Sequence, residues 1–133
     1  PKKLGVKIAF DNALSHKIEA GCDMFLMPSR YEPCGLNQIY SLRYGTIPIV
    51  RATGGLDDTI KDYNKGEGNG IKFVEYSEDA LVAKVKEAVT VYSDKKAWQT
   101  LQKKAMSEDF SWDVSAGKYV ELYELAIKKA SKS

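Results

Sequence analysis

The sequence predicts an α/β fold in which helices cover both faces of a parallel β-sheet. Short apolar runs alternate with segments of helical periodicity through the first half of the chain. One run, from Met24 to Met27, is uninterrupted, which is typical of a strand buried on both faces. From Ser77 onward the apolar period becomes 3.6 residues, which indicates consecutive helices. We therefore expect one unit that spans residues 1–133.

The expected strands are apolar or alternating runs that end at turn residues. They span residues 4–10, 22–27, 46–50 and 71–74. Pro48 is compatible with the third strand if it lies near an edge or at an unpaired position. Residues 63–70 are polar and contain three glycines, so we expect a loop there.

The expected helices begin after residues that can cap them. Asp11 or Asn12 caps a helix that runs through Ala20. Two further helices span residues 36–44, ending at a capping glycine, and residues 56–60. Three closing helices follow the caps Ser77, Asp94 and Ser111, and the last spans residues 112–130.

The apolar positions predict which face of each helix packs inward. In helix 36–44 these positions are Leu36, Ile39, Tyr40 and Tyr44. The stripe of the first closing helix includes Val82 and Val89, and that of the second includes Met106. The last helix carries Trp112, Ala116, Tyr119, Val120, Tyr123 and Ile127 on one face. Three closing helices exceed what four short strands need, so we expect part of the last one to pack on something outside this chain.

Composition narrows the class of protein. A formal net charge of +2 is too small to indicate a nucleic-acid partner, and no segment approaches the roughly 20 apolar residues of a membrane helix. The two cysteines, Cys22 and Cys34, favour reduced thiols in the cytoplasm. With His16 as the one histidine, we expect no metal site. The chain lacks a starting Met and any visible signal peptide, so we expect it to be a piece of a longer protein.

The strongest candidate site is the loop from Pro28 to Gln38, between an expected strand and an expected helix. In parallel α/β sheets, ligands bind where strands end and helices begin. The first N–H groups of the helix lack partners there, and the helix dipole favours an anion such as phosphate. Gly35 lets a phosphate approach the backbone. Glu32, one turn upstream, is an unusual residue for a site that binds only phosphate.

These residues carry a resemblance to a known family. The segment PSRYEPCGLNQIYSLRYGTIPIVRATGGLDDTI, residues 28–60, resembles the signature of bacterial glycogen synthases and plant starch synthases. The similarity continues through Phe110–Trp112 and Tyr119 to Tyr123. It implies a retaining glycosyltransferase with two Rossmann-like domains around a cleft. This chain would be most of the C-terminal domain of such a B-type enzyme, which binds the nucleotide sugar.

The resemblance also implies roles for individual residues around the donor glucose. Glu32 would lie beside the transferred glucose and stabilise positive charge there; the alternative is a loop carboxylate that caps the helix. Cys34 would line the glucose pocket with Gly35, or it would be a small buried residue. Thr53 and Gly54, at the adjacent strand end, would shape the same pocket or would form a structural turn.

Further roles concern the nucleotide. The backbone N–H groups of Gly35, Leu36 and Asn37 would bind the distal phosphate. Relatives often carry Thr at the Asn37 position, and Asn is longer. Phe10 would stack on the base, where relatives place an aromatic residue; the alternative is a core residue that ends the first strand. We interpret His16 as structural.

The implied reaction moves glucose from ADP-glucose or UDP-glucose to an α-1,4-glucan, without metal or cofactor, in the cytoplasm or in the plastid of a plant. Relatives bind the diphosphate with an Arg and a Lys upstream and the glucan through an N-terminal domain, so this chain alone should be inactive. The alternatives are another two-domain glycosyltransferase, related to sucrose or lipid sugars, and a non-catalytic module that binds nucleotide or glucan.

Overall fold

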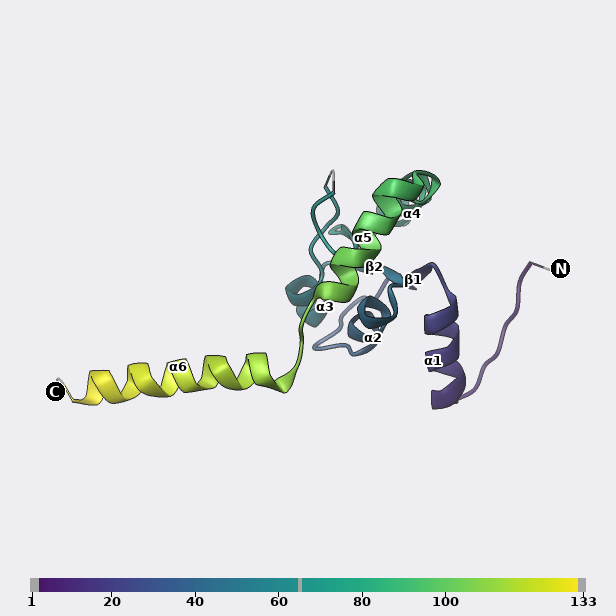
Figure 1. Ribbon diagram of the computed structural model, residues 1–133. Coiled ribbons are helices and arrows are strands. Elements are labelled where there is room, and N and C mark those ends of the chain that lie inside the picture. Colours follow the sequence, from purple (N-terminus) through teal and green to yellow (C-terminus); the bar gives the residue numbers. More distant parts are fainter. Residues whose placement is uncertain (1–2, 65, 132–133) are drawn as a thin grey trace.

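A computed structural model describes residues 3–64 and 66–131 of the chain, so five positions of the expected unit 1–133 lie outside the described residues. Three parallel strands form one sheet in the order β1 (Met24–Met27), β2 (Ile47–Arg51) and β3 (Ile71–Phe73). Met24 pairs with Ile47, and Ile49 pairs with Ile71. Helices pack around this sheet (Figure 1), which confirms the α/β class.

The helices are the following: α1 (Asn12–Gly21), α2 (Asn37–Tyr44), α3 (Gly54–Thr59), α4 (Glu78–Ser93), α5 (Lys95–Ser107) and α6 (Trp112–Ala130). The predicted caps Asp11, Ser77 and Asp94 each accept a hydrogen bond from a backbone N–H of the helix that they begin. Ser111 lies at the N-cap of α6 without such a bond. None of the helices in the described residues is long and apolar enough to cross a membrane.

Strand β2 is the centre of the core. Successive residues of a strand point to opposite faces of the sheet, and all four of the residues Ile47 to Val50 are buried. Both faces of β2 are therefore covered, by helices α2, α3, α4 and α5. The core continues into Leu56, Ile71, Trp98 and Leu101, among others.

Pro48 lies in the central strand and not near an edge. The N–H of Ile47 donates to the Asp23 oxygen, 3.0 Å away, on the β1 side. Backbone groups alternate in direction along a strand, so the Pro48 nitrogen faces the β3 side. Pairing there begins only at Ile49 with Ile71. Pro48 is thus the register partner of Phe25 on the β1 side and is unpaired on the β3 side, which fits the second possibility on that side alone.

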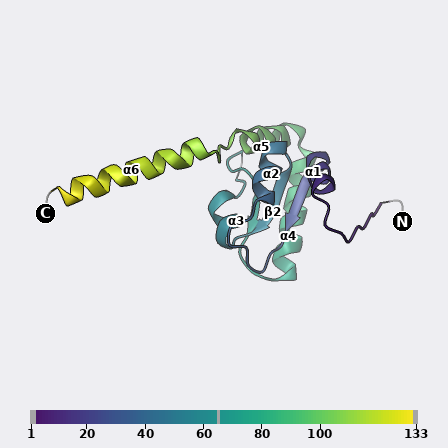
Figure 2. The same ribbon diagram turned by 90° about the horizontal axis from the view of Figure 1, so that it is seen from below.

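The predicted first strand, residues 4–10, is wrong. This segment is extended and exposed, with no strand assignment, and Phe10 is 99% exposed. Figures 1 and 2 show it running past α1, away from the sheet. A strand needs a neighbour to pair with, and no described strand other than β2 pairs with β1. The alternating pattern therefore has no partner among the described residues.

Two helix faces differ from the predicted ones. Helix α2 buries Gln38, Ser41 and Leu42, whereas Leu36 and Tyr44 are exposed. Helix α4 buries Ala88, which belongs to the predicted stripe, but leaves Val82 and Val89 of the same stripe about half exposed. In both helices the neighbouring elements select the inward face, and hydrophobicity alone did not identify it.

Helix α6 has the predicted bounds but no buried residue, and every residue of it is described. Trp112 is 84% exposed, and the other residues of its predicted apolar face are also exposed. Figures 1 and 2 both show α6 projecting away from the rest of the molecule. The predicted inward face of this helix is therefore uncovered in the structure.

Candidate functional site

The candidate loop joins the end of β1 to the start of α2, as the sequence predicts. Pro28 follows the strand, and Leu36 is the N-cap residue of α2. Gly35 has φ +70°, a conformation that residues with a side chain rarely adopt. The loop therefore lies at the carboxyl end of the parallel sheet, where α/β proteins bind ligands.

The N-terminus of α2 is open. No side chain caps it in the described part of the chain, and the backbone N–H groups of Leu36 and Asn37 donate to no described residue. These N–H groups and the helix dipole together favour an anion. The alternative role of Glu32, a carboxylate that caps this helix, is contradicted.

A second turn packs directly against this loop. Thr53 is the N-cap residue of α3, and the Gly55 N–H donates to the carbonyl oxygens of Glu32, at 3.0 Å, and Pro33, at 3.2 Å. A Cβ at Gly54 would overlap the Glu32 carbonyl oxygen, and one at Gly55 would overlap the Cys34 carbonyl oxygen. The structure thus brings the predicted residues Thr53 and Gly54 to the predicted Glu32 loop.

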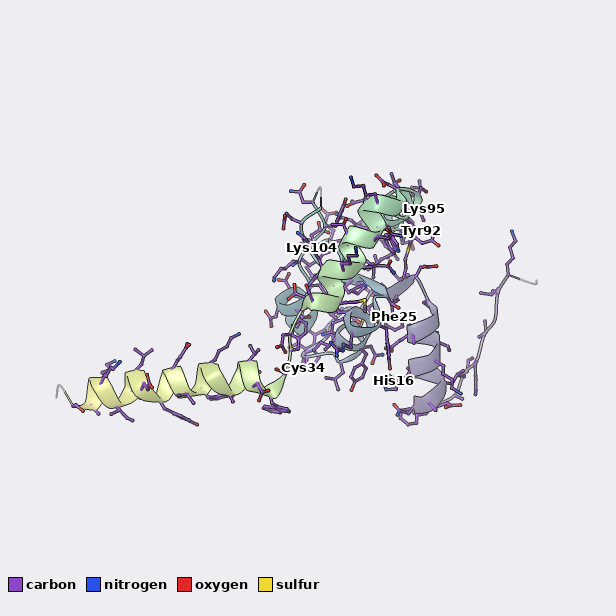
Figure 3. The ribbon with its side chains drawn as sticks, viewed as in Figure 1. His16, Phe25, Cys34, Tyr92, Lys95 and Lys104 are labelled. Carbon is purple, nitrogen blue, oxygen red and sulfur yellow. The ribbon has the colours of Figure 1, made fainter. Side chains whose placement is uncertain are left out.

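The side chains of the loop residues differ in exposure. Glu32 is partly buried, and no hydrogen bond or salt bridge of the described residues involves its carboxylate. The Cys34 thiol is free and exposed, so the alternative of a small buried residue is wrong. Figure 3 shows Cys34 at the end of the body away from Tyr92 and Lys95. Both side chains are therefore available to a ligand.

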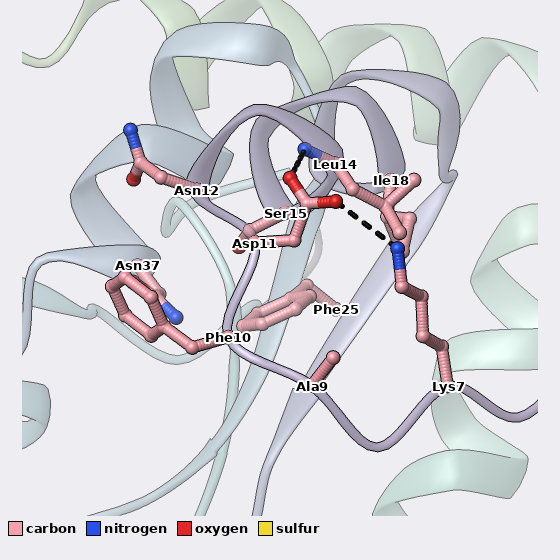
Figure 4. A pocket seen from close by; sticks show the side chains of 10 residues that line it. All are labelled: Lys7, Ala9, Phe10, Asp11, Asn12, Leu14, Ser15, Ile18, Phe25 and Asn37. Atoms are coloured by element: carbon pink, nitrogen blue, oxygen red, sulfur yellow. Dashed lines mark hydrogen bonds and ion pairs between the residues drawn. The ribbon is translucent and has the colours of Figure 1, made fainter.

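Phe10 and Asn37 line the same pocket, which has a volume of about 430 Å³ (Figure 4). Phe25 of β1 and Leu14 of α1 also line it. Pockets for small molecules typically have volumes of about 300–1,000 Å³. Because Asn37 begins α2, this pocket adjoins the open helix N-terminus. The alternative of Phe10 as a core residue is wrong because its ring is exposed.

Asp11 holds the end of the exposed segment at this pocket. Its carboxylate accepts from the Leu14 N–H and from Lys7 Nζ, each 3.0 Å away. The hydrogen bond from Leu14 and then that from Lys7 lower the Asp11 pKa. The carboxylate therefore caps α1 beside Phe10 in its charged form.

Arg51 is a site residue that the sequence did not reveal. Its Nη1 donates to the Arg30 oxygen at 2.7 Å and to the Ser29 oxygen at 3.4 Å, and its guanidinium lies 5.2 Å from the centre of the Tyr76 ring. It therefore holds the start of the loop from the end of β2. A basic residue directly after an apolar strand was the available signal.

Gln38 is the second such residue. It is fully buried, and its side-chain amide donates to the carbonyl oxygens of Cys34 and Gly35. The available signal was a long polar side chain three residues after Gly35 and four residues after Cys34, the spacing at which helix residues are neighbours.

The Nδ1 of His16 lies 3.3 Å from the Tyr44 hydroxyl, and its ring packs against Tyr40, so His16 joins α1 to α2. Among the described residues, no group of three His, Cys, Asp or Glu side chains could hold a metal ion.

Known proteins are similar to this chain over a range that includes the candidate loop. A family model described as glycosyl transferases group 1 matches residues 7–105. A glycogen synthase from Koribacter versatilis (strain Ellin345) is 60% identical over 128 residues, which are 95% of this chain and 26% of that protein. The chain thus spans about a quarter of the length of the curated relatives it matches.

Solved structures show the same fold. The catalytic domain of starch synthase IV from Arabidopsis thaliana, bound to ADP and acarbose, matches with a TM-score of 0.77 and 39% identity, over 91% of this chain and 26% of that chain. Sucrose-phosphate synthase from Thermosynechococcus elongatus matches with a TM-score of 0.59 over 84% of this chain and 27% of that chain. At 24% identity, the second likeness concerns the fold alone.

Proposed function

We propose that the full-length protein moves glucose from a nucleotide sugar to an α-1,4-glucan, because this chain belongs to the glycosyl transferases of group 1. The donor is ADP-glucose or UDP-glucose, the acceptor is the non-reducing end of the glucan, and the anomeric configuration is retained. The 60% identity to a glycogen synthase and the likeness to a starch synthase support this proposal.

The observation that carries the proposal is the uncapped N-terminus of α2 directly after the loop that holds Glu32. The backbone N–H groups of Gly35, Leu36 and Asn37 bind the distal phosphate of the donor. They share the negative charge of the leaving diphosphate with basic side chains that other parts of the full-length protein supply. The ADP bound to the starch synthase supports a nucleotide as ligand.

The remaining loop residues surround the glucose. The Glu32 carboxylate hydrogen-bonds sugar hydroxyls and stabilises the oxocarbenium-like positive charge of the transition state. Cys34 and the turn of Thr53 and Gly54 line the glucose pocket. Phe10 stacks on the base, and the pocket that it shares with Asn37 supports this role.

The proposal includes no metal and no cofactor. In this proposal the chain is most of the C-terminal domain of a two-domain enzyme, and the N-terminal domain of that enzyme binds the glucan. The proposal places the full-length protein in the cytoplasm, or in the plastid of a plant.

Replacing Glu32 tests the catalytic role. In the full-length protein, Glu32→Ala should lower turnover about 100-fold or more, because charge stabilisation in the transition state is lost. The affinity for ADP should stay within about threefold, since ADP lacks the glucose that Glu32 contacts. Glu75→Ala, at an exposed glutamate after β3, is the matched control. Near-normal turnover of the Glu32 variant would refute the role.

Acceptor and donor assays test the reaction. The full-length protein should transfer labelled glucose to glycogen, and new linkages should have the α configuration by NMR of the anomeric proton. Transfer to fructose 6-phosphate or to a lipid, and not to glycogen, would favour the other two-domain glycosyltransferases.

Titration with ADP tests the alternative of a non-catalytic module. The 133-residue chain alone should bind ADP weakly and should transfer no glucose, because the diphosphate needs further basic residues. Sub-micromolar affinity of the chain alone would contradict this expectation and would favour a binding module.

A further inference from the structure

Gln38 is a polar residue in an apolar environment. Its side chain is 0% exposed, on the inward face of α2 beside Leu42. A buried amide is costly unless its donors and acceptors have partners. Its hydrogen bonds therefore indicate what the residue does.

The amide of Gln38 joins the two turns of the site. Its Nε2 lies 3.0 Å from the Cys34 oxygen, 3.0 Å from the Gly35 oxygen and 3.3 Å from the Thr59 hydroxyl. The Thr59 hydroxyl in turn donates to the Gly55 oxygen at 2.6 Å. One side chain thus connects the Glu32 loop to α3, whose first turn touches the same loop.

Gly35 makes room for this amide. A Cβ at position 35 would lie 2.5 Å from Gln38 Oε1 and 3.0 Å from its Nε2. Oε1 is buried and has no hydrogen-bond partner in the described part of the chain. The Gln38 amide therefore contributes through its N–H donors, and its Oε1 acceptor is left without a hydrogen bond.

These hydrogen bonds fix the direction of two backbone N–H groups. In a trans peptide the C=O and the N–H point in opposite directions, and no cis peptide occurs among the described residues. The Cys34 carbonyl shares its peptide with the Gly35 N–H, and the Gly35 carbonyl shares its peptide with the Leu36 N–H. Because both carbonyls point to Gln38, both N–H groups point away from it.

We propose that Gln38 is a positioning residue: its buried amide aims the N–H groups of Gly35 and Leu36 at the phosphate of the donor. This inference rests on the proposed function, because these N–H groups are the proposed phosphate ligands. Thr59 supports the amide from α3. Gln38 itself does not touch the ligand.

The test uses Gln38→Met in the full-length protein, which keeps the length of the side chain and removes its donors. Gln102→Met is the matched control, because Gln102 Nε2 donates to the Gly45 oxygen at 2.9 Å, at the opposite end of α2. Each variant loses a hydrogen bond from glutamine to a backbone carbonyl. Thr59→Ser keeps the supporting hydroxyl, and Thr59→Val removes it.

We expect Gln38→Met to raise the Kd of ADP about tenfold and to lower kcat/KM for the nucleotide sugar about 10- to 100-fold, as misplaced groups do. Gln102→Met should lower the melting temperature without changing either constant. Thr59→Val should change both constants in the same direction as Gln38→Met but by less. Thr59→Ser should keep the wild-type values of both constants. If Gln38→Met matches Gln102→Met within about twofold in both constants, the positioning role is refuted.

Hydrogen exchange separates this inference from the proposed function. In Gln38→Met, peptides that cover residues 29–37 and 53–59 should exchange faster, because the Gly55 N–H bonds to the loop that Gln38 holds. Unchanged exchange would refute the connection itself. If the wild-type protein binds no ADP and transfers no glucose, the proposed function is refuted, and so is the positioning of the two N–H groups toward a phosphate. Hydrogen exchange would still show whether Gln38 connects the Glu32 loop to α3.

Discussion

At the residue scale, Gly55 is the point where the two turns of the site touch. Its N–H donates to the Glu32 oxygen, and the Cys34 oxygen occupies the space that a Cβ would need. The opposing atom belongs to the backbone, which cannot rotate away as a side chain can. Only glycine fits there without moving the loop.

Gly55→Ala should therefore destabilise the chain. We expect a cost of about 2 kcal/mol, which lowers the melting temperature by roughly 5–10 °C. Thermal unfolding followed by circular dichroism measures this shift. Gly21→Ala is the matched control, because no atom lies within 4 Å of the added Cβ. Equal melting temperatures of the two variants would mean that the turns do not touch as described.

Glu19 is a buried carboxyl group near the end of α1. Its Oε2 has no partner among the described residues. Burial raises the Glu19 pKa, and the charge of His16 and a hydrogen bond from Ser15 partly oppose that rise. A carboxyl group whose pKa is higher in the folded state binds protons more readily there. Stability therefore falls as the pH rises from about 4.5, the ordinary value, through the raised pKa.

Glu19→Gln should remove this pH dependence. At pH 8 the variant should melt roughly 3 °C higher than the wild type, because no charge is buried. At pH 4 the difference should shrink, since the wild-type carboxyl group is then protonated. Melting curves at both pH values provide the measurement, with Glu75→Gln as an exposed control. A larger gain at pH 4 than at pH 8 would reverse the sign and refute the explanation.

The site residues divide by how local their signals are. The open start of α2 at Leu36 and Asn37 could be predicted because a strand, a turn and a helix start follow one another within a few residues. The role of Gln38 could not, since it depends on Thr59, which is 21 residues away in sequence. The role of Arg51 depends likewise on the loop carbonyl oxygens of Ser29 and Arg30.

At the element scale, helix α5 depends on its N-cap residue, Asp94. Asp94 Oδ1 accepts from the N–H groups of Lys96, at 3.0 Å, and Ala97, at 3.1 Å. The helix then buries Trp98 and Leu101 against the core. The cap thus fixes where the helix begins, and the buried residues Trp98, Leu101 and Ala105 set the face that packs inward.

Asp94→Ala should cost about 1 kcal/mol, the usual value of a lost N-cap. Asp94→Asn keeps an oxygen acceptor and should remain within about 0.5 kcal/mol of the wild type. Urea unfolding of the 133-residue chain measures both. If the Asn variant loses as much as the Ala variant, the carboxylate acts through its charge and not as a cap.

Element predictions succeeded where the signals lie in neighbouring residues. Ser77, Asp94 and Asp11, the last with Asn12 as the alternative, are predicted caps that the structure confirms, because a cap acts on the next turn. Ser111 lies at the predicted N-cap but makes no such hydrogen bond. Residues 4–10 were misassigned because alternation describes a strand but supplies no partner. The inward face of α2 was misassigned because packing selected Gln38 and Ser41 over Tyr44.

At the scale of the whole molecule, the surface is larger than that of a compact protein. A compact monomer of 14.8 kDa exposes roughly 7,000 Å², whereas this chain exposes 9809 Å². The projecting helix α6 and the exposed segment before α1 account for the difference in shape (Figure 2). The compact part of the chain therefore contains α1 to α5 and the sheet.

Removing residues 112–133 should leave the stability of the compact part unchanged, because no residue of α6 is buried. We expect the melting temperature to change by less than about 1 °C. In the 133-residue chain, α6 should unfold at a lower temperature than the compact part, since an isolated helix of this length is marginally stable. Fluorescence of Trp98 in a Trp112→Phe background follows the compact part alone. A clear fall in melting temperature would show that α6 contributes packing.

The contact between the backbones of Gly55 and Glu32 has a consequence for the mobility of the Glu32 loop. The Gly55 N–H donates to the carbonyl oxygens of Glu32 and Pro33, and the Gln38 amide donates to those of Cys34 and Gly35. The loop can therefore move aside only if these hydrogen bonds break. We therefore expect the loop to keep the same conformation with and without a ligand.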